Sequence, residues 1–190
     1  MSDEKKGSRA LTIAIEAAIL VVAVFIGLAV RYGVYYTAIV TSSSMEPTLL
    51  VNDRMLVDHR ASLSGRWKRG DTVLFREPQS WNKDGGASQD DGTELVKRVI
   101  GLPGETVEIG ANRVLVNGQP IGEPYVKEAW NADVLQVTLA PGQYFVMGDN
   151  RNNSDDSRAN GPVYKDDIIG RAVRLLGPIS RMGALKRPDY

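Results

Sequence analysis

The sequence has no cysteine and a single histidine among its 190 residues. The lack of cysteine excludes disulfide bonds, thiolate catalysis and cysteine-based metal sites, and it agrees with life in an oxidising compartment. The one histidine, His59, lies in the polar run 58–60, where a solvated loop side chain is the simpler interpretation. A nucleophile in this chain would therefore need another base. Lysine is the next candidate, because a buried amine can lose its proton near neutral pH.

Neither sign of charge is in excess, since 23 lysines and arginines match 23 aspartates and glutamates. A balanced charge implies no general attraction to polyanions, so we expect no nucleic-acid partner. The length suits one domain of ordinary size with its own core, together with an appendage.

The appendage is predicted at the N-terminus. Residues 1–9 are polar and carry three basic side chains, and residues 10–30 are apolar except for Thr12 and Glu16. A helix of 21 residues is about 31 Å long, close to the hydrocarbon thickness of a bilayer. Glu16 lies near one end of this helix, where a carboxylate is tolerated. The preceding basic residues favour a cytoplasmic N-terminus. An outer interfacial belt would consist of Tyr32, Tyr35 and Tyr36.

A cleaved signal peptide is the alternative for this segment, because residues 27–29 form a small-x-small site after an uncharged run. We favour an anchor. The chain would then be a single-pass protein of the cell membrane, with residues 31–190 on the extracytoplasmic side.

The rest of the sequence is β-like, with short runs rich in branched and aromatic residues between glycine, proline and asparagine. This pattern predicts a mainly β, antiparallel fold. Asn117 and Gly118 favour a two-residue hairpin turn with a return strand at 119–121. Residues 77–93 hold one tryptophan and little else apolar, which predicts an exposed, mobile loop. The predicted strands are 54–57, 72–75, 95–100, 106–109, 114–116, 136–139 and 144–147.

The segment TSSSMEPTLL at 41–50 holds the candidate nucleophile, Ser44. A serine hydroxyl attacks a carbonyl only when a neighbouring base takes its proton. Because Pro47 disfavours helix at Glu46, we expect an extended or turning segment that exposes the Ser44 hydroxyl and leaves its amide free to donate. A serine-rich linker is the alternative, but it does not explain Met45, Pro47 and Thr48, which follow the serines.

Lys97 is the candidate base, in an alternating run at 95–100. In a strand, Lys97 shares a face with Leu95 and Val99, whereas Arg98 points to the opposite face. Apolar neighbours, and distance from carboxylates, would lower the pKa of Lys97 toward the range that a general base requires. An ordinary solvated strand lysine is the alternative.

Four segments together resemble the sequence boxes of bacterial type I signal peptidases, which are membrane-anchored Ser/Lys proteases. They are SSSMEPTL at 42–49, NDRMLV at 52–57, VKRVIGLPGE at 96–105 and GDNRNNSDDSR at 148–158. Their order and approximate spacing match, and four boxes in order make chance agreement very improbable. The resemblance implies an antiparallel β catalytic domain of signal-peptidase type after one transmembrane helix, with a small β-extension at about 105–142.

The resemblance also implies roles for individual residues. Ser44 would be the nucleophile and Lys97 the base, with the Ser44 amide and the Ser42 hydroxyl as oxyanion donors. Ser154 would hydrogen-bond the Lys97 amine. Four further residues would support the dyad: Asp149 would pair with Arg98, and Asp156 and Arg158 would brace the loop. No metal or cofactor is required.

Two shallow pockets, for the P1 and P3 side chains of a substrate, are implied as well. A packed core explains each of their candidate residues equally well. A calcium loop at 149–156 is a weaker alternative for the acidic box, because its spacing lacks the usual calcium-loop pattern. The pocket candidates are Val40, Met45, Leu49, Met55 and Val96. The calcium-ligand candidates are Asp149, Asn150, Asn152, Asp155 and Asp156.

The predicted function is removal of signal peptides from preproteins at the bilayer surface, after small-x-small sites such as Ala-x-Ala. One alternative is a Ser/Lys autoprotease of the repressor-processing kind, although such proteins lack a membrane anchor. The other is a membrane-anchored β-domain that binds peptides without cleaving them.

Overall fold

The computed structural model describes residues 13, 15–28, 34–81, 93–110 and 112–190. The chain forms two compact units, residues 1–35 and 36–190, which we describe separately. The second unit contains every candidate catalytic residue.

In the first unit, residues 15–28 form an α-helix whose side chains are exposed, and Ile13 is also helical. The ends of the expected span, at 10–12 and 29–30, lie outside the described residues, as do Thr12, position 14 and Tyr32. Within the part of the chain that is described, no helix is both long and apolar enough to cross a membrane. Of the expected tyrosine belt, Tyr35 and Tyr36 begin a strand, and the Tyr36 hydroxyl donates to Glu94 Oε2 at 3.2 Å.

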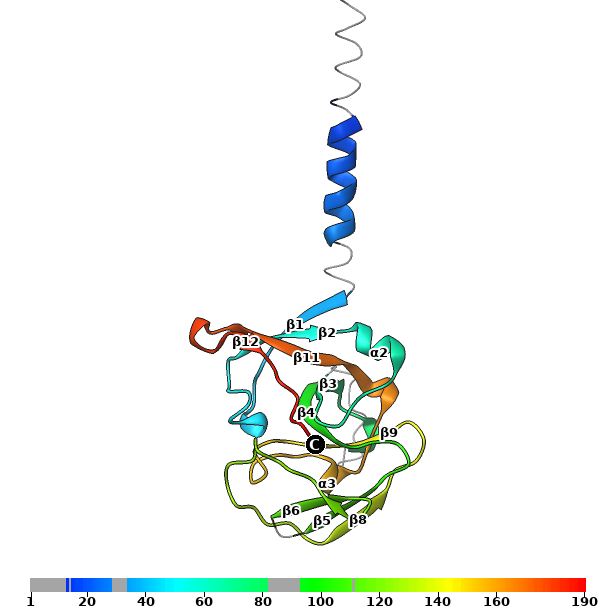
Figure 1. Cartoon of the computed structure of the whole chain (residues 1–190), viewed down its shortest axis with the longest axis vertical. Coiled ribbons are helices and arrows are strands. Elements are labelled where there is room, and N and C mark those ends of the chain that lie inside the picture. Colours follow the sequence, from blue (N-terminus) through cyan, green and yellow to red (C-terminus); the bar gives the residue numbers. More distant parts are fainter. Residues whose placement is uncertain (1–12, 14, 29–33, 82–92, 111) are drawn as a thin grey trace, which may run out of the picture. The chain divides into compact units, whose positions relative to one another are not determined.

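The second unit is built on an eight-stranded sheet (Figure 1), in the order β1-β2-β11-β3-β4-β9-β10, with β12 added alongside β11. The neighbours from β2 to β10 along this order pair in antiparallel fashion. The mainly β, antiparallel fold expected from the sequence is therefore confirmed. The strands are β1 Tyr35–Ile39, β2 Arg54–Asp58, β3 Thr72–Arg76, β4 Glu94–Gly101, β9 Gln143–Met147, β10 Val163–Tyr164, β11 Ile168–Gly177 and β12 Gly183–Ala184.

A second, four-stranded sheet lies within the range expected for a β-extension, in the order β7-β6-β5-β8. Asn117 and Gly118 have φ angles of 52° and 76° at the β6–β7 turn, which confirms the predicted hairpin. The strands are β5 Thr106–Gly110, β6 Arg113–Val116, β7 Gln119–Pro120 and β8 Leu135–Thr138.

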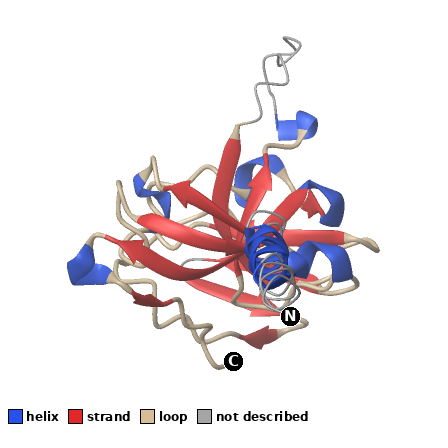
Figure 2. Ribbon diagram, turned by 90° about the horizontal axis from the view of Figure 1, so that it is seen from above, coloured by secondary structure: helices blue, strands red, loops and turns tan. Residues whose placement is uncertain are grey.

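Helices in the second unit are single turns or little more, and strands dominate the view in Figure 2. The α-helices are α2 Arg60–Ser64 and α3 Ser157–Asn160. The 3-10 turns are η1 Ser43–Met45, η2 Gln79–Trp81, η3 Lys165–Asp167 and η4 Ile179–Arg181.

Three hydrophobic clusters form the core, and alternation along β4 distributes its residues among them. Val99 packs in a cluster with Trp67 and Phe75, and Ile100 in a cluster with the apolar face of the small sheet. Val96 packs against the third cluster, which contains residues of η1 and β2. β4 is therefore held on both faces, and its side chains have little freedom to move.

The expected fold has one omission and one error. β11, which lies between β2 and β3 near the middle of the sheet, is not among the predicted strands, and neither are β1, β10 and β12. Gly170 and the arginines at 171 and 174 interrupt the run of apolar residues in β11, and its register shifts against both neighbouring strands. The glycine is needed because a Cβ at position 170 would lie 2.8 Å from the Asp58 carbonyl oxygen of the neighbouring strand.

The error concerns the segment 77–93. Its tryptophan, Trp81, is 4% exposed and packs edge-on against Phe75 with ring centroids 5.5 Å apart. An apolar ring of this size gains more from the core than from solvent, so this end of the segment is folded. Residues 82–92 lie outside the described part of the chain.

Candidate active site

Ser44 lies in the turn η1, which follows β1 in the chain. Of the two conformations expected, the turn is the one observed. Glu46, with φ −64° and ψ 142°, is extended, as a residue before proline should be. Ser44 is only 7% exposed, so the expectation of an exposed side chain was wrong. The loop at 148–158 contacts the backbone of this turn, since the Asn150 amide donates to the Ser44 carbonyl at 3.0 Å.

Lys97 reaches Ser44 from the middle of β4. Its Nζ donates to Ser44 Oγ at 2.7 Å, although 53 residues separate the two along the chain. The lysine is 4% exposed. In the neutral amine, the nitrogen lone pair can accept the Ser44 proton along the same line of contact. The pair therefore has the geometry of a nucleophile and its base.

Burial lowers the pKa of Lys97 below the ordinary lysine value. The charges of Asp156 and Asp155 act in the opposite direction, and that of Arg158 reinforces the lowering. The expected distance from carboxylates is thus wrong for two residues of the 148–158 loop. Burial outweighs both carboxylates, so the pKa stays lowered.

The hydroxyl of Ser42 lies 3.2 Å from Ser44 Oγ. Ser42 is exposed, at the edge of the buried pair. A donor in this place is within reach of an oxygen bonded to a carbon that Ser44 attacks. The oxyanion roles of Ser42 and the Ser44 amide stay predictions.

Arg98, the next residue of β4, points to the opposite face and pairs with Asp149. Its Nε donates to Oδ1 at 2.8 Å and its Nη2 to Oδ2 at 2.6 Å, and Nη1 donates to the Gly70 carbonyl at 2.9 Å. Both side chains are buried. Burial lowers the pKa of Arg98, but the hydrogen bonds and charge of Asp149 outweigh it, so the pKa is raised and the charge is permanent.

The loop 148–158 is organised by the buried carboxylate of Asp156. It accepts from the Gly148 amide at 2.9 Å, from the Ser154 hydroxyl at 2.7 Å and from Arg158 Nε at 2.8 Å. Burial raises the pKa of Asp156, but the bonds and charge of Arg158 and the other donors outweigh it, so the pKa is lowered. The Ser154 hydroxyl is thus directed at Asp156, and its bond to Lys97 stays a prediction.

Gly148 lies where this loop crosses the Ser44 turn. A Cβ here would be 2.2 Å from Ser154 Oγ and 2.5 Å from the Ser44 carbonyl oxygen, distances that real Cβ atoms do not show. The absence of a side chain at this position therefore allows the loop and the turn to meet.

The pocket candidates pack into a hydrophobic cluster. Met45, Leu49 and Met55 are at most 1% exposed, Val40 is 5% exposed, and Val96 is partly buried at the edge of the cluster. This is the core packing that the sequence analysis named as the alternative. Their contact with a substrate stays a prediction.

Two residues that hold the Ser44 turn were missed as such. Asn150 Nδ2 donates to the Ser43 carbonyl at 3.2 Å, and Asn153 Nδ2 donates to Ser43 Oγ at 2.7 Å. The box GDNRNNSDDSR contains both, but only their neighbours were given structural roles. Of the five calcium-ligand candidates, Asp149 and Asp156 form salt bridges with arginines. Across the described ranges, no group of three or more histidine, aspartate or glutamate side chains could hold a metal ion.

The comparisons with known proteins identify the family of the chain. Residues 13–176 match the family model described as signal peptidase, peptidase S26. The chain belongs to the signal peptidase family. A signal peptidase I from Leptolyngbya laminosa is 38% identical over 165 residues, covering 87% of this chain and 80% of the relative. A probable signal peptidase I-1 from Synechocystis is 38% identical over 167 residues, covering 88% and 84%.

One solved member of the family, a signal peptidase I from Enterococcus faecalis V583, is 31% identical. It matches with a TM-score of 0.46, covering 56% of this chain and 96% of that one. The match of the family model includes Ser44, Lys97 and the whole loop 148–158. The candidate site of this signal peptidase family member therefore lies within the matched residues.

Proposed function

We propose that the protein is a signal peptidase I, a serine endopeptidase that removes N-terminal signal peptides from preproteins after small-x-small sites. The observation that carries this proposal is the buried contact of 2.7 Å between Lys97 Nζ and Ser44 Oγ in a chain of this family. The lowered pKa of Lys97 supports it, because only the neutral amine can act as a base.

In the proposed reaction, Ser44 Oγ attacks the scissile carbonyl carbon while neutral Lys97 takes the hydroxyl proton. The Ser44 amide and the Ser42 hydroxyl donate to the oxyanion that forms. The C–N bond then breaks, the amine leaves with the proton from Lys97, and the signal peptide stays on Ser44 as an ester. Lys97 next takes a proton from water, whose attack releases the signal peptide as a carboxylic acid and restores the Ser44 hydroxyl.

The loop at 148–158 would hold this pair in a single arrangement. Asp156 connects Gly148, Ser154 and Arg158, and the first of these lies against the Ser44 turn. The lysine side chain has four rotatable bonds, and it speeds the reaction only if its amine is held beside the serine hydroxyl. The loop contacts would therefore raise kcat.

We further propose that residues 10–30 anchor the enzyme as a single membrane span, with the domain of residues 31–190 on the extracytoplasmic side. The apolar run and the preceding basic residues support this orientation. A substrate held in the same bilayer by its own apolar segment would then meet the site at a raised effective concentration.

The experiment compares the detergent-solubilised wild type with Ser44→Ala on a preprotein that bears an Ala-x-Ala site, and the product is sequenced from its N-terminus. We expect cleavage after the second alanine by the wild type and none by the variant. Ser80→Ala, at an exposed serine of η2, is the matched control and should cleave as the wild type does.

Each other outcome has a definite meaning. Cleavage by Ser44→Ala would show that Ser44 is not the nucleophile. If neither protein cleaves although both are folded, the peptide-binding domain without catalysis becomes the better interpretation. Cleavage at sites without small residues would contradict the proposed specificity alone.

A further inference from the structure

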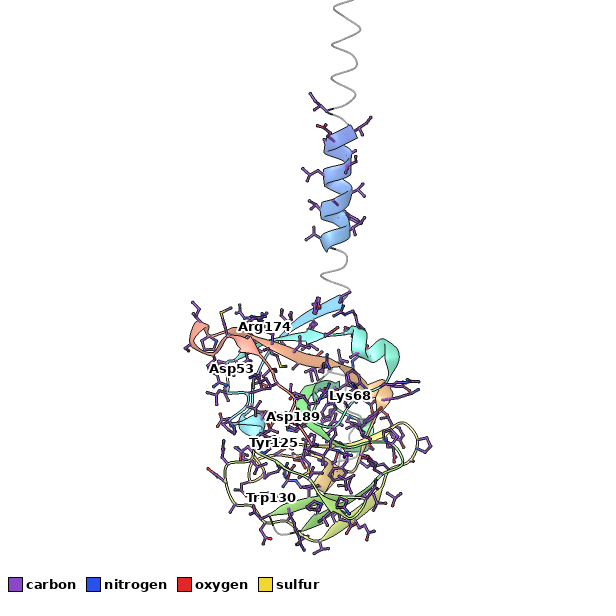
Figure 3. All side chains as sticks on the ribbon, viewed as in Figure 1. Asp53, Lys68, Tyr125, Trp130, Arg174 and Asp189 are labelled. Atoms are coloured by element: carbon purple, nitrogen blue, oxygen red, sulfur yellow. The ribbon has the colours of Figure 1, made fainter. Side chains whose placement is uncertain are left out.

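The segment that connects β7 with β8, residues 121–134, runs from the small sheet to the loop 148–158. Three of its side chains, Glu123, Tyr125 and Trp130, contact buried arginines next to the candidate active site. Figure 3 labels Tyr125 and Trp130 in this region. The proposed reaction assigns no role to any of the three.

Tyr125 covers Arg98. The guanidinium carbon of Arg98 lies 4.1 Å from the centre of the Tyr125 ring, a cation–π contact between two buried side chains. The Tyr125 hydroxyl donates to Glu123 Oε1 at 2.8 Å and lies 3.0 Å from the Tyr190 hydroxyl. Burial raises the pKa of Tyr125, so its hydroxyl keeps its proton and remains a donor. The ring is thus held in place over Arg98.

Glu123 holds Arg151. Arg151 Nη1 donates to Glu123 Oε2 at 3.0 Å, and Arg151 Nε donates to the Gly148 carbonyl at 3.0 Å. The arginine side chain is 1% exposed. Its guanidinium also lies 5.0 Å from the Trp130 ring centre. Because Arg151 is bonded to Gly148, its position fixes the start of the loop that carries Ser154 and Asp156.

The charges of this group balance. Two buried arginines, Arg98 and Arg151, face two carboxylates, Asp149 and Glu123. Removing the Glu123 charge would leave an excess positive charge in a buried site, which the protein can relieve only by moving a side chain or admitting water. These four side chains therefore keep a single arrangement only when all four of their charges are present.

A displacement at Gly148 would be passed on to the dyad. The Gly148 amide is bonded to Asp156, and the charge of Asp156 acts on Lys97. Arg158, the partner of Asp156, also lies 5.6 Å from the Trp130 ring centre. The β7–β8 connection therefore contacts the loop at Arg151 and Arg158, and the loop bonds to the Ser44 carbonyl and acts on Lys97 through its charges.

We propose that Glu123 and Tyr125 are positioning residues, which fix Arg151 and Arg98 and thereby hold the loop 148–158 against the Ser44–Lys97 pair. This inference rests on the proposed function, since it needs Lys97 to act on Ser44. It gives the small sheet a part in catalysis, although none of the described residues of its strands belongs to the dyad.

The test measures kcat and KM of the full chain in detergent for Glu123→Gln, Tyr125→Leu and Tyr125→Phe. We expect Glu123→Gln and Tyr125→Leu to lower kcat about tenfold or more with KM within about twofold, because a misplaced catalytic group slows the chemical step. Tyr125→Phe keeps the ring over Arg98 and should lose less than Tyr125→Leu.

Matched controls separate positioning from stability. Tyr144 is another buried tyrosine with a bonded hydroxyl, and Glu105 is another partly buried glutamate paired with an arginine. Tyr144→Leu and Glu105→Gln should lower the melting temperature as much as their counterparts, while kcat of the folded protein stays at the wild-type value.

The acidic limb of the pH profile of kcat is a second readout. Lys97 faces Asp155, Asp156 and Arg158 from the loop and Ser44 from η1. A loosened loop admits water and removes part of the burial that lowers the lysine pKa. The acidic limb of Glu123→Gln should therefore move to higher pH, whereas a purely structural role would leave it in place.

The failures can be told apart. Wild-type kcat and an unmoved limb in folded Glu123→Gln and Tyr125→Leu would overturn this inference while cleavage by the wild type leaves the proposed function standing. A wild type that does not cleave would overturn both. If Tyr125→Leu does not fold, the nearly isosteric Glu123→Gln and Tyr125→Phe decide the question.

Discussion

Lys97 and Arg98 are adjacent cations of β4, and both are buried, yet their surroundings have opposite effects on their charges. Arg98 is held by Asp149, by the Gly70 carbonyl and by the Tyr125 ring, and its pKa is raised. Lys97 has the Ser44 hydroxyl as its bonded partner, and its pKa is lowered. Burial alone therefore does not decide the state of a cation. The carboxylate of Asp149, in direct contact with Arg98, makes the charge of Arg98 permanent. Lys97 is bonded to a hydroxyl and not to a carboxylate, so its amine can become neutral and take part in proton transfer.

The largest effect is expected for Lys97→Arg. Arginine keeps a charge and a donor but cannot become neutral, so it cannot serve as the base. We expect kcat/KM on a preprotein to fall on the order of 10³-fold. Lys165→Arg, at an exposed lysine, is the control. Retained activity in Lys97→Arg would mean that the reaction does not need a neutral side chain at position 97. The contrast between Lys97 and Arg98 would then not explain catalysis.

On the other face, Asp149→Asn should act on stability. It leaves Arg98 buried without its anion, and we expect a loss of about 3–5 kcal/mol in the free energy of unfolding. Urea unfolding of the folded chain measures this loss. Asp58→Asn removes a pair whose arginine is largely exposed and should cost about 1 kcal/mol or less. Equal losses for the two variants would contradict the role given to burial.

Gly148→Ala tests the close contact between the loop 148–158 and the Ser44 turn. The new Cβ would overlap Ser154 Oγ and the Ser44 carbonyl, so the loop must move away from the dyad. We expect kcat to fall about tenfold to a hundredfold, as for misplacement of a catalytic group by an ångström. Gly183→Ala, where nothing lies within 4 Å of the new Cβ, is the control. Wild-type kcat in Gly148→Ala would show that the loop position does not limit the reaction.

A smaller effect concerns the pH dependence of stability. Because the pKa of Lys97 is lower in the folded state, the unfolded state binds more protons below the ordinary lysine value of 10.5. The buried lysine therefore costs stability at pH 7, and this cost vanishes as the pH rises toward 10.5. Lys97→Met should raise the free energy of unfolding at pH 7 and gain less at pH 10. Urea unfolding at both pH values checks the sign, and a gain that grows with pH would contradict it.

The smallest effect is expected far from both cations, at the β6–β7 turn. Gly118 has a φ of 76°, which an alanine adopts only with strain, so Gly118→Ala should cost about 1 kcal/mol of stability. Its kcat should equal that of the wild type, as measured in the same cleavage assay. A clear loss of kcat would mean that the small sheet acts on the site through its strands as well as through Glu123 and Tyr125.

The strands formed by an unbroken run of branched and aromatic residues were predictable, whereas β11 was not. β2, β3, β4, β5 and β9 were predicted to within about two residues, because each such run lies between turn-forming residues. β11 was missed although its residues alternate between buried and half-buried, since glycine and arginine positions hide the pattern. Trp81 was assigned to solvent because its neighbours are polar, whereas its burial depends on Phe75 of another element.

The sequence by itself determined the β class, the Asn-Gly turn, the opposite faces of Lys97 and Arg98 and the four segments that carry the family resemblance. These follow from local preferences and from the two-residue period of a strand, which do not depend on distant partners. Only the tertiary structure decided that Lys97 meets Ser44 across 53 residues, that Ser154 is directed to Asp156, and that Glu123 and Tyr125 hold the buried arginines. Burial and pairing arise from segments far apart in the chain, and a pKa in a protein is set by those surroundings.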